Sequence, residues 1–146
     1  MNQTISQERI LHLKRDYERG FIRHCGFKAA RVERGKFGSF VDLKDHHRQQ
    51  DGFVHAGVMA TMADHTAGYA AFTIVDPSFQ ILSIEFKINF FKPAFGKGLE
   101  CRSTVIREGR KVIVAESEVY DLGENHRAMT AKAMVTLMAV PGDSLV

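Results

Sequence analysis

The sequence predicts an α+β fold in which a curved antiparallel sheet of about six strands wraps around one long central helix. Three observations lead to this prediction. Residues 53–75 form an almost uncharged run that is too long for a single strand. Residues 82–90 then alternate between apolar and polar side chains, which is typical of a half-buried strand. The connectors that follow are short and contain glycine, which favours hairpins and therefore antiparallel pairing.

The segment before the central run predicts one helix followed by two strands. Residues 6–19 carry a narrow apolar stripe, start at Ser6 as a candidate N-cap and end at a glycine. Residues 27–34 and 37–43 predict two strands that are joined around another glycine. No internal repeat or composition shift marks a boundary, so we expect residues 1–146 to form a single domain with this short N-terminal helix.

The central run is apolar on every side, so we expect a helix that other elements surround. Asp64 is its only charged residue, and a carboxylate in such a helix is costly to bury unless it is hydrogen-bonded or used in chemistry. Small residues at three- and four-residue steps would let a sheet approach closely: Ala60, Ala63, Ala67, Gly68 and Ala71. The run is long enough to cross a bilayer, but Asp64 and two histidines argue against insertion, so no membrane partner is expected.

The strand at residues 82–90 predicts two faces of opposite character. The apolar face holds Leu82, Ile84, Phe86, Ile88 and Phe90, and the polar face holds Ser83, Glu85, Lys87 and Asn89. Three further strands are predicted at residues 98–107, 111–121 and 127–140. Together with the two N-terminal strands they make a sheet that can cover the helix.

The composition is that of an ordinary globular protein and argues against several functional classes. The 146 residues carry a net charge of +3, with 20 Lys and Arg residues scattered along the chain. This balance suits an acidic ligand, but without a dense basic run it predicts no nucleic-acid partner. Cys25 and Cys101 are too few for a disulfide framework or a cysteine metal cluster. The N-terminus is polar rather than signal-like, so we expect a cytoplasmic protein.

The residues at the entrance to the central helix form a recognisable motif. Residues 49–57 read QQDGFVHAG, and Asp64 follows nine residues after His55. This pattern resembles that of PaaI-type hotdog-fold acyl-CoA thioesterases, in which Asn, two variable residues, Gly, two variable residues and His-Gly-Gly precede an Asp on the helix. With the order of elements, the resemblance covers about residues 26–139. It implies a hotdog fold and hydrolysis of an acyl-CoA substrate, with no cofactor beyond the coenzyme A of that substrate.

Thioester hydrolysis needs a polarised carbonyl, a positioned water and a group that takes the proton of that water. The first N–H groups of a helix are unpaired and lie at the positive end of its dipole, so those near Ala56 and Gly57 are candidate oxyanion donors. By the resemblance, Asp64 is the base that activates water, and a nucleophile that forms an anhydride is the alternative. Ser83 either orients the water, as in some relatives, or is an ordinary strand hydroxyl.

The spacing of His55 and Asp64 bears on the oligomeric state. At about 100° per residue, nine residues turn about 900°, so the two side chains would lie on roughly opposite sides of a continuous helix. Two chains packed helix against helix could bring both to one carbonyl more readily than one chain. The resemblance implies the same, because family sites lie at a dimer interface with the Asp from one subunit and the oxyanion donors from the other. We therefore expect a homo-oligomer, either a dimer or a tetramer of two dimers.

The chain departs from the family pattern at two positions. Ala56 replaces the first Gly of His-Gly-Gly, which keeps a backbone N–H but adds a methyl group beside the acyl site. Gln49 stands where relatives have the Asn that contacts the thioester region, and Gln50 is a candidate substitute for it. These departures keep open a non-catalytic acyl-CoA-binding or sensing module. A hotdog hydroxyacyl-CoA dehydratase that uses His55 with a carboxylate is the other alternative.

Other candidate residues have ordinary structural explanations beside the functional ones. We expect His55 to anchor its loop through a ring hydrogen bond, and His65 to make packing or interface contacts. His46 and His47 lack the neighbouring ligands that a metal site needs, so no metal is expected. Two explanations fit the basic residues Arg107, Arg110 and Lys111: they bind the phosphates of coenzyme A, or they form an ordinary solvated turn. Six large apolar residues either line a pocket for the acyl group or belong to the ordinary hydrophobic core: Phe53, Met59, Met62, Phe72, Phe90 and Phe91.

Overall fold

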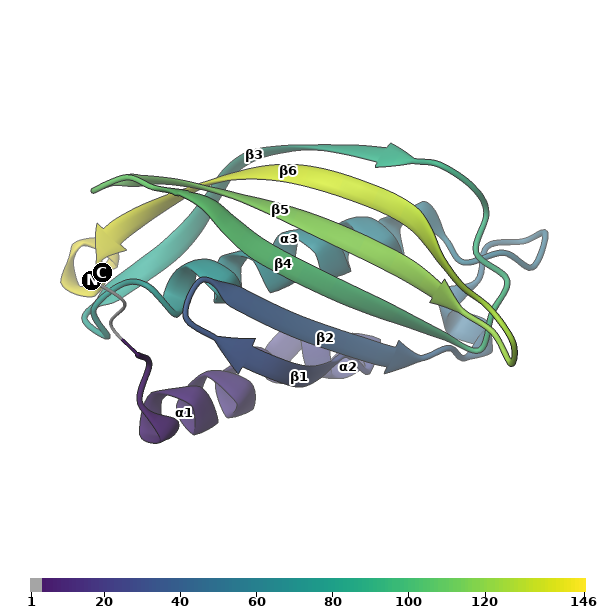
Figure 1. Cartoon of the computed structure of the whole chain (residues 1–146), viewed down its shortest axis with the longest axis horizontal. Coiled ribbons are helices and arrows are strands. Elements are labelled where there is room, and N and C mark those ends of the chain that lie inside the picture. Colours follow the sequence, from purple (N-terminus) through teal and green to yellow (C-terminus); the bar gives the residue numbers. More distant parts are fainter. Residues whose placement is uncertain (1–3) are drawn as a thin grey trace.

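The computed structural model describes residues 4–146, in which a curved sheet wraps around one long helix (Figure 1). The helices are α1 (Gln7–Tyr17), α2 (Gly20–Cys25) and α3 (Ala56–Phe72), with short 3-10 turns at Asp45–His47 and Gly142–Leu145. The strands are β1 (Lys28–Glu33), β2 (Lys36–Asp42), β3 (Phe79–Phe90), β4 (Gly98–Glu108), β5 (Val112–Leu122) and β6 (Arg127–Pro141). They pair antiparallel in the order β1-β2-β4-β5-β6-β3. The predicted α+β architecture is therefore confirmed.

The inner face of the sheet packs on α3. Alternate side chains of β5 and β6, such as Ile113 and Leu137, point toward the helix and are fully buried, as is Met62 of α3. The small residues of α3 let the sheet approach the helix closely. The Ser117 hydroxyl of β5 reaches the helix backbone and donates a 2.7 Å hydrogen bond to the Ala63 carbonyl. The small-residue face predicted for this helix thus lies where the sheet crosses it.

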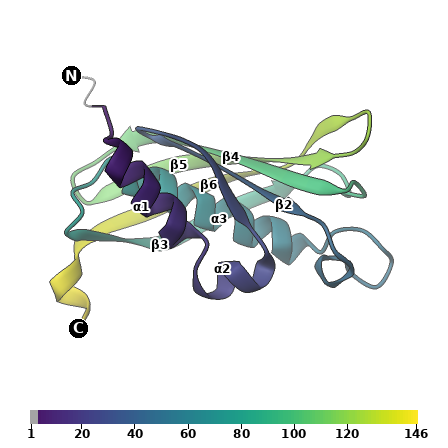
Figure 2. The same cartoon turned by 90° about the horizontal axis from the view of Figure 1, so that it is seen from below.

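The N-terminal helix α1 packs against another flank of α3 (Figure 2). α1 begins after Ser6, which caps it, and ends at Tyr17, whose buried hydroxyl lies 3.0 Å from that of Thr66 on α3. The sequence did not predict α2, which is only six residues long. The helix starts at Gly20, with φ 59°, and ends before Gly26, with φ 78°. Because it is so short, it contains no apolar repeat that a sequence pattern could reveal.

β3 contains a bulge that its alternating sequence hides. The register of β3 against β6 shifts between Ser83 and Glu85, so one extra residue interrupts the alternation. Before the shift, Leu82 lies opposite Met138 on the outer face, and after it Phe86 lies opposite the buried Val135 on the inner face. The prediction that Leu82, Ile84, Phe86, Ile88 and Phe90 share one face was therefore wrong.

β3 is also the edge of the sheet, because within residues 4–146 it pairs only with β6. Its apolar side chains remain accessible, with Ile84 51% exposed and both Leu82 and Phe90 44% exposed. The strand is therefore less buried than its pattern predicts. An apolar edge strand of this length is a template for pairing with another chain.

α3 is shorter and less enclosed than predicted. The run at residues 53–75 forms regular helix only over Ala56–Phe72, and no helix in the described part of the chain is long and apolar enough to cross a membrane. The sheet and α1 leave one stripe exposed or half-exposed: Gly57, Thr61, Asp64 and Gly68. The expectation that other elements enclose this helix on every side is wrong for a single chain.

Candidate active site

The loop before α3 places His55 as the cap of that helix. His55 has an extended backbone, with φ −62° and ψ 133°, and its Nδ1 accepts a 2.8 Å hydrogen bond from the Gly57 N–H. A Cβ at position 57 would lie 3.0 Å from this ring nitrogen, so a glycine there leaves room for the cap. His55 therefore acts as the structural anchor of the loop.

This cap decides which N–H groups of the first turn a ligand can use. The Gly57 N–H is engaged by His55, and the Val58 N–H donates to the His55 carbonyl at 2.9 Å. Ala56 is the first residue of α3, so its N–H has no helical carbonyl four residues before it. It lies at the positive end of a 17-residue helix and lines a pocket. Of the two expected oxyanion donors, Ala56 is the one that offers its N–H.

Asp64 and Ser83 meet between α3 and β3. Asp64 lies on the uncovered stripe of the helix and is half-exposed in the single chain. The Ser83 hydroxyl, which points inward from β3 just before the bulge, donates a 2.6 Å hydrogen bond to Asp64 Oδ1. No other donor within residues 4–146 hydrogen-bonds this carboxylate. Ser83 thus orients Asp64 and leaves Oδ2 available to a water molecule.

The two parts of the candidate site lie apart within one chain. Asp64 follows Ala56 by eight residues on the same helix, which corresponds to about 12 Å along the helix axis. A carbonyl group that is bound at the Ala56 N–H is therefore beyond the reach of a water molecule that is held by the Asp64 of the same chain.

A pocket of about 540 Å³ opens beside the start of α3. Its lining is mostly apolar and comes from the loop, the helix and the end of β3: Phe53, Val54, Met59, Phe90, Phe91 and Pro93. The polar part of the lining consists of Gln49, Gln50, His55 and Lys92, and the Ala56 N-terminus of the helix also reaches it. Of the apolar residues singled out in the sequence, Met62 is instead fully buried and Phe72 packs against the core.

The two glutamines lie at this pocket but are partly committed to the turn that precedes α3. The side-chain oxygen of Gln49 accepts a hydrogen bond from the Asp51 N–H. The amide nitrogen of Gln50 donates to Asp51 Oδ2 at 3.4 Å. The side-chain NH₂ of Gln49 is therefore the group that this residue can still offer to a ligand.

Arg48, which the sequence did not single out, ties two loops of the pocket together. Its Nη1 donates to the Gly52 carbonyl at 3.1 Å, within the turn that precedes α3. Its Nη2 donates to the Gly96 carbonyl at 2.9 Å, in the loop between β3 and β4. The Gly52 contact is local, but the Gly96 contact joins segments that are 48 residues apart, so no local motif predicts it.

Asp121 holds the same loop from the end of β5. It is 5% exposed, and its carboxylate accepts the N–H groups of Phe95 at 3.1 Å and Gly96 at 2.9 Å. His126 Nε2 contacts the same carboxylate at 3.2 Å. Phe95 packs edge-on against Phe53 of the pocket, with ring centroids 4.9 Å apart. Asp121 thereby supports one wall of the pocket. The sequence does not predict this role, because an Asp shortly before a glycine turn is a common pattern.

Two other histidines, His65 and His47, make structural contacts. His65 Nε2–H donates to the Tyr17 carbonyl at 3.0 Å, and burial lowers the pKa of this imidazole. His47 is buried, with Nδ1 accepting from the Lys44 N–H at 2.9 Å and Nε2 2.6 Å from the Cys25 carbonyl. Across residues 4–146, no group of three or more His, Cys, Asp or Glu side chains is placed to hold a metal ion.

The basic turn singled out in the sequence lies at the opposite end of the molecule from the start of α3 (Figure 1). Arg107, Arg110 and Lys111 lie at or beside the turn that joins β4 to β5. The pocket lies at the other end of β4, whose 11 residues span about 35 Å. In a single chain, these three residues are therefore better explained as a solvated turn than as a binding site for coenzyme A phosphates.

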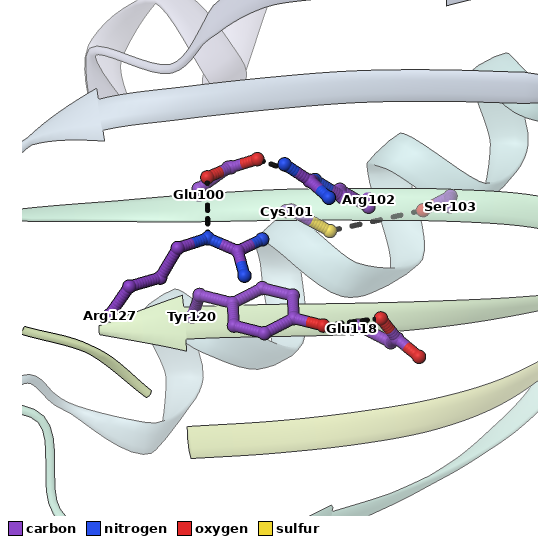
Figure 3. A network of polar contacts seen from close by, with 7 residues as sticks. All are labelled: Glu100, Cys101, Arg102, Ser103, Glu118, Tyr120 and Arg127. Carbon is purple, nitrogen blue, oxygen red and sulfur yellow. Dashed lines mark hydrogen bonds and ion pairs between the residues drawn. The ribbon is translucent and has the colours of Figure 1, made fainter. Parts of the chain in front are cut away.

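A second hollow, of about 630 Å³, lies on the outer face of β1, β2, β4 and β5, away from α3. Several of the charges beside it pair with one another (Figure 3). Glu100 binds Arg102 at 2.6 Å and Arg127 at 3.3 Å, and the Arg127 guanidinium lies 3.6 Å from the centroid of the Tyr120 ring. The Tyr120 hydroxyl donates to Glu118 at 2.6 Å, and this bond lowers the pKa of the Glu118 carboxyl. We therefore place the candidate site at the start of α3.

Comparison with known proteins agrees with the motif at this site. Residues 51–127 match the Thioesterase superfamily. A thioesterase family protein from Silicibacter pomeroyi is 30% identical in sequence, and its structure aligns with a TM-score of 0.86 over 90% of this chain and 98% of that one. The E. coli PaaI protein from the phenylacetic acid degradation operon aligns with a TM-score of 0.82 over 94% of this chain and 97% of that one, at 16% identity. The second likeness shows the shared fold.

A curated protein of Saccharolobus solfataricus that is named as a proposed esterase is also similar. It is 32% identical over 94 residues, which are 64% of this chain and 66% of that protein. The chain thus spans just under two thirds of that relative. The hotdog fold and the resemblance to PaaI-type thioesterases, both expected from the sequence, are confirmed by these comparisons.

Proposed function

Because the chain belongs to the Thioesterase superfamily, whose match includes Asp64, we propose that it hydrolyses the thioester bond of an acyl-coenzyme A substrate. The observation that carries this proposal is the Asp64 carboxylate, which is fixed by Ser83 on the uncovered stripe of α3. A carboxylate that is oriented by one hydroxyl and open on its other oxygen can hold and deprotonate a water molecule.

In the proposed reaction, Asp64 takes a proton from a bound water as the oxygen of that water attacks the thioester carbonyl carbon. The Ala56 N–H donates to the oxyanion that forms, and the positive end of the helix dipole stabilises it further. The carbon–sulfur bond then breaks, the coenzyme A sulfur receives the proton, and a free carboxylic acid remains. Attack by Asp64 itself to give an anhydride is the alternative first step. The chain's own residues supply every group in this scheme, so we expect activity without a metal or an added cofactor.

The proposed site is shared between two protomers. About 12 Å separates Ala56 from Asp64 along one helix, so a second chain must supply one of the two groups. The free edge of β3 suits such a pairing, because it is 12 residues long and exposes Leu82, Ile84 and Phe90. A two-fold axis beside this edge would join two sheets and bring the uncovered stripes of two α3 helices together. We propose a homodimer of this kind, or a tetramer of two such dimers.

Mixing two inactive variants tests the shared site. Ala56→Pro removes one N–H where proline is well tolerated, at the first position of a helix, and His55 already has the extended backbone that precedes a proline. Asp64→Asn removes the base. In a shared site, heterodimers formed by co-refolding keep one intact site of two, so an equal mixture should recover about a quarter of the wild-type activity. A mixture as inactive as its components would contradict a site shared in this way.

Thiol release from short, medium, long and aryl acyl-CoA thioesters tests the activity itself. Release from at least one substrate, unchanged by a metal chelator, would support the proposal. Two outcomes would replace it. Hydration of a crotonyl thioester without thiol release would indicate the dehydratase-type alternative. Tight acyl-CoA binding without either reaction would indicate a sensing module, with Ala56 and Gln49 as the departures that explain it.

A further inference from the structure

Lys92 is the one charged residue in the lining of the pocket beside α3. The other lining residues are apolar, apart from the side chains of two glutamines and His55, and none of them is a carboxylate. Lys92 follows the end of β3 and is exposed. Within the described residues its ammonium group makes no ion pair. An apolar pocket with a single uncompensated cation is suited to a ligand that has both apolar and anionic parts.

The backbone around Lys92 is held on both sides, so the side chain projects from a fixed position. The Phe91 N–H donates to the Thr130 carbonyl at 2.8 Å, and the buried Thr130 hydroxyl donates to the Lys92 carbonyl. Beyond Pro93, the Ala94 carbonyl accepts the Val54 N–H at 3.0 Å. A pinned backbone reduces the conformational freedom that a lysine must lose when it binds a ligand.

Neighbouring cations are already engaged, which distinguishes Lys92 from them. Lys97, in the same loop, pairs with Glu124. The guanidinium of Arg48 donates hydrogen bonds to the carbonyls of Gly52 and Gly96. The N-terminus of α3 adds a second positive contribution at Ala56, on the pocket wall. Asp51, in the turn before α3, does not line the pocket, and its Oδ2 accepts from Gln50.

We propose that Lys92 binds an anionic group of the thioester substrate, an inference that rests on the proposed function. A coenzyme A thioester offers two sources for such a group: the phosphates of coenzyme A, or a carboxylate at the far end of the acyl chain. The ammonium group would form a charge-assisted hydrogen bond to either one at the pocket mouth.

Lys92→Gln, with Lys97→Gln as the control, tests this assignment on one neutral acyl group carried by coenzyme A and by phosphate-free pantetheine. Both variants lose one positive charge from the same loop, but only Lys92 lines the pocket. On a substrate that carries the anionic group, loss of the Lys92 contact should raise KM about five- to tenfold with kcat largely kept. Lys92→Arg should restore most of the affinity because it keeps the charge.

The substrate set identifies the source of the anion. A rise in KM that is present with acyl-CoA and absent with acyl-pantetheine assigns Lys92 to a phosphate. A rise confined to acyl groups with a terminal carboxylate, compared with neutral acyl groups of the same length, assigns it to that carboxylate. KM values for Lys92→Gln that match those of Lys97→Gln on every substrate would overturn the inference.

Binding of coenzyme A, measured by calorimetry, separates this inference from the proposed function. If the wild type releases no thiol from any thioester, hydrolysis fails as the function, yet weaker coenzyme A binding by Lys92→Gln than by Lys97→Gln would still support a phosphate contact. In that case, equal binding by the two variants, both of coenzyme A and of an acyl-CoA with a terminal carboxylate, would overturn the Lys92 assignment as well.

Discussion

The Ser83 hydroxyl donates a 2.6 Å hydrogen bond to the Asp64 carboxylate, and this contact joins the edge strand β3 to the central helix α3. Ser83 stands just before the bulge at which the register of β3 shifts against β6. Bulges re-aim side chains and are common next to active sites. Here the bulge separates an inward Ser83 from an inward Phe86, so a polar and an apolar side chain both face the helix side of the sheet.

Ser83→Ala should lower kcat about tenfold while the protein stays folded, because Asp64 would lose the hydrogen bond that orients it. Steady-state thiol release measures the effect, and circular dichroism checks the fold. The matched control is Ser78→Ala, because Ser78 also donates a 2.6 Å bond to an aspartate, Asp76, on an exposed turn. Equal rates for the two variants would show that Ser83 is an ordinary strand hydroxyl.

Asp121→Ala should reduce the free energy of unfolding by about 2–4 kcal/mol, because it leaves the buried Gly96 N–H and the Phe95 N–H without their acceptor. Urea denaturation measures this change. Glu118→Gln, on the same strand but with partners only on the outer face, should cost about 0.5 kcal/mol or less. Similar losses for both variants would mean that Asp121 does not hold the pocket loop.

His65 should make the protein less stable as the pH falls from neutrality. Burial lowers the pKa of His65 below its ordinary value of 6.5, although Asp64 and Asp16 act in the opposite sense. Between the unfolded and folded pKa values, His65 is protonated in the unfolded chain but not in the folded chain. The free energy of unfolding therefore falls by up to about 1.4 kcal/mol for each unit by which the pH is lowered in this range. His65→Gln should flatten this dependence between pH 7 and 5.5. An unchanged slope in the variant would exclude His65 as its source.

Much of the fold could be predicted from the sequence because its strongest signals are local. The apolar run around Asp64 and the alternation after it indicate one long helix and an antiparallel sheet without any knowledge of contacts. The position of His55 at the start of the helix also follows from local sequence, because it precedes Ala56 and Gly57 at the beginning of the apolar run.

The features that the sequence did not reveal depend on contacts between distant segments. The bulge in β3 leaves its alternating pattern intact and becomes visible only in the pairing of Leu82 with Met138 and Phe86 with Val135. Arg48 and Asp121 act on backbone groups of the loop at Gly96, which composition does not mark. A ring hydrogen bond of His55 is expected from the sequence, but its partner, the Gly57 N–H, depends on a local side-chain rotamer, and this choice leaves Ala56 as the accessible donor.

Thiol release by Asp64→Asn tests the central claim most directly. The variant removes the proton acceptor but keeps the size of the side chain and an oxygen that can accept from Ser83. We predict that its kcat on the best acyl-CoA substrate falls by about 100-fold or more while its fold and oligomeric state match those of the wild type. Asp51→Asn, at the neighbouring turn, should retain most of the activity. Turnover by Asp64→Asn at the wild-type rate would contradict the assignment of Asp64 as the catalytic base.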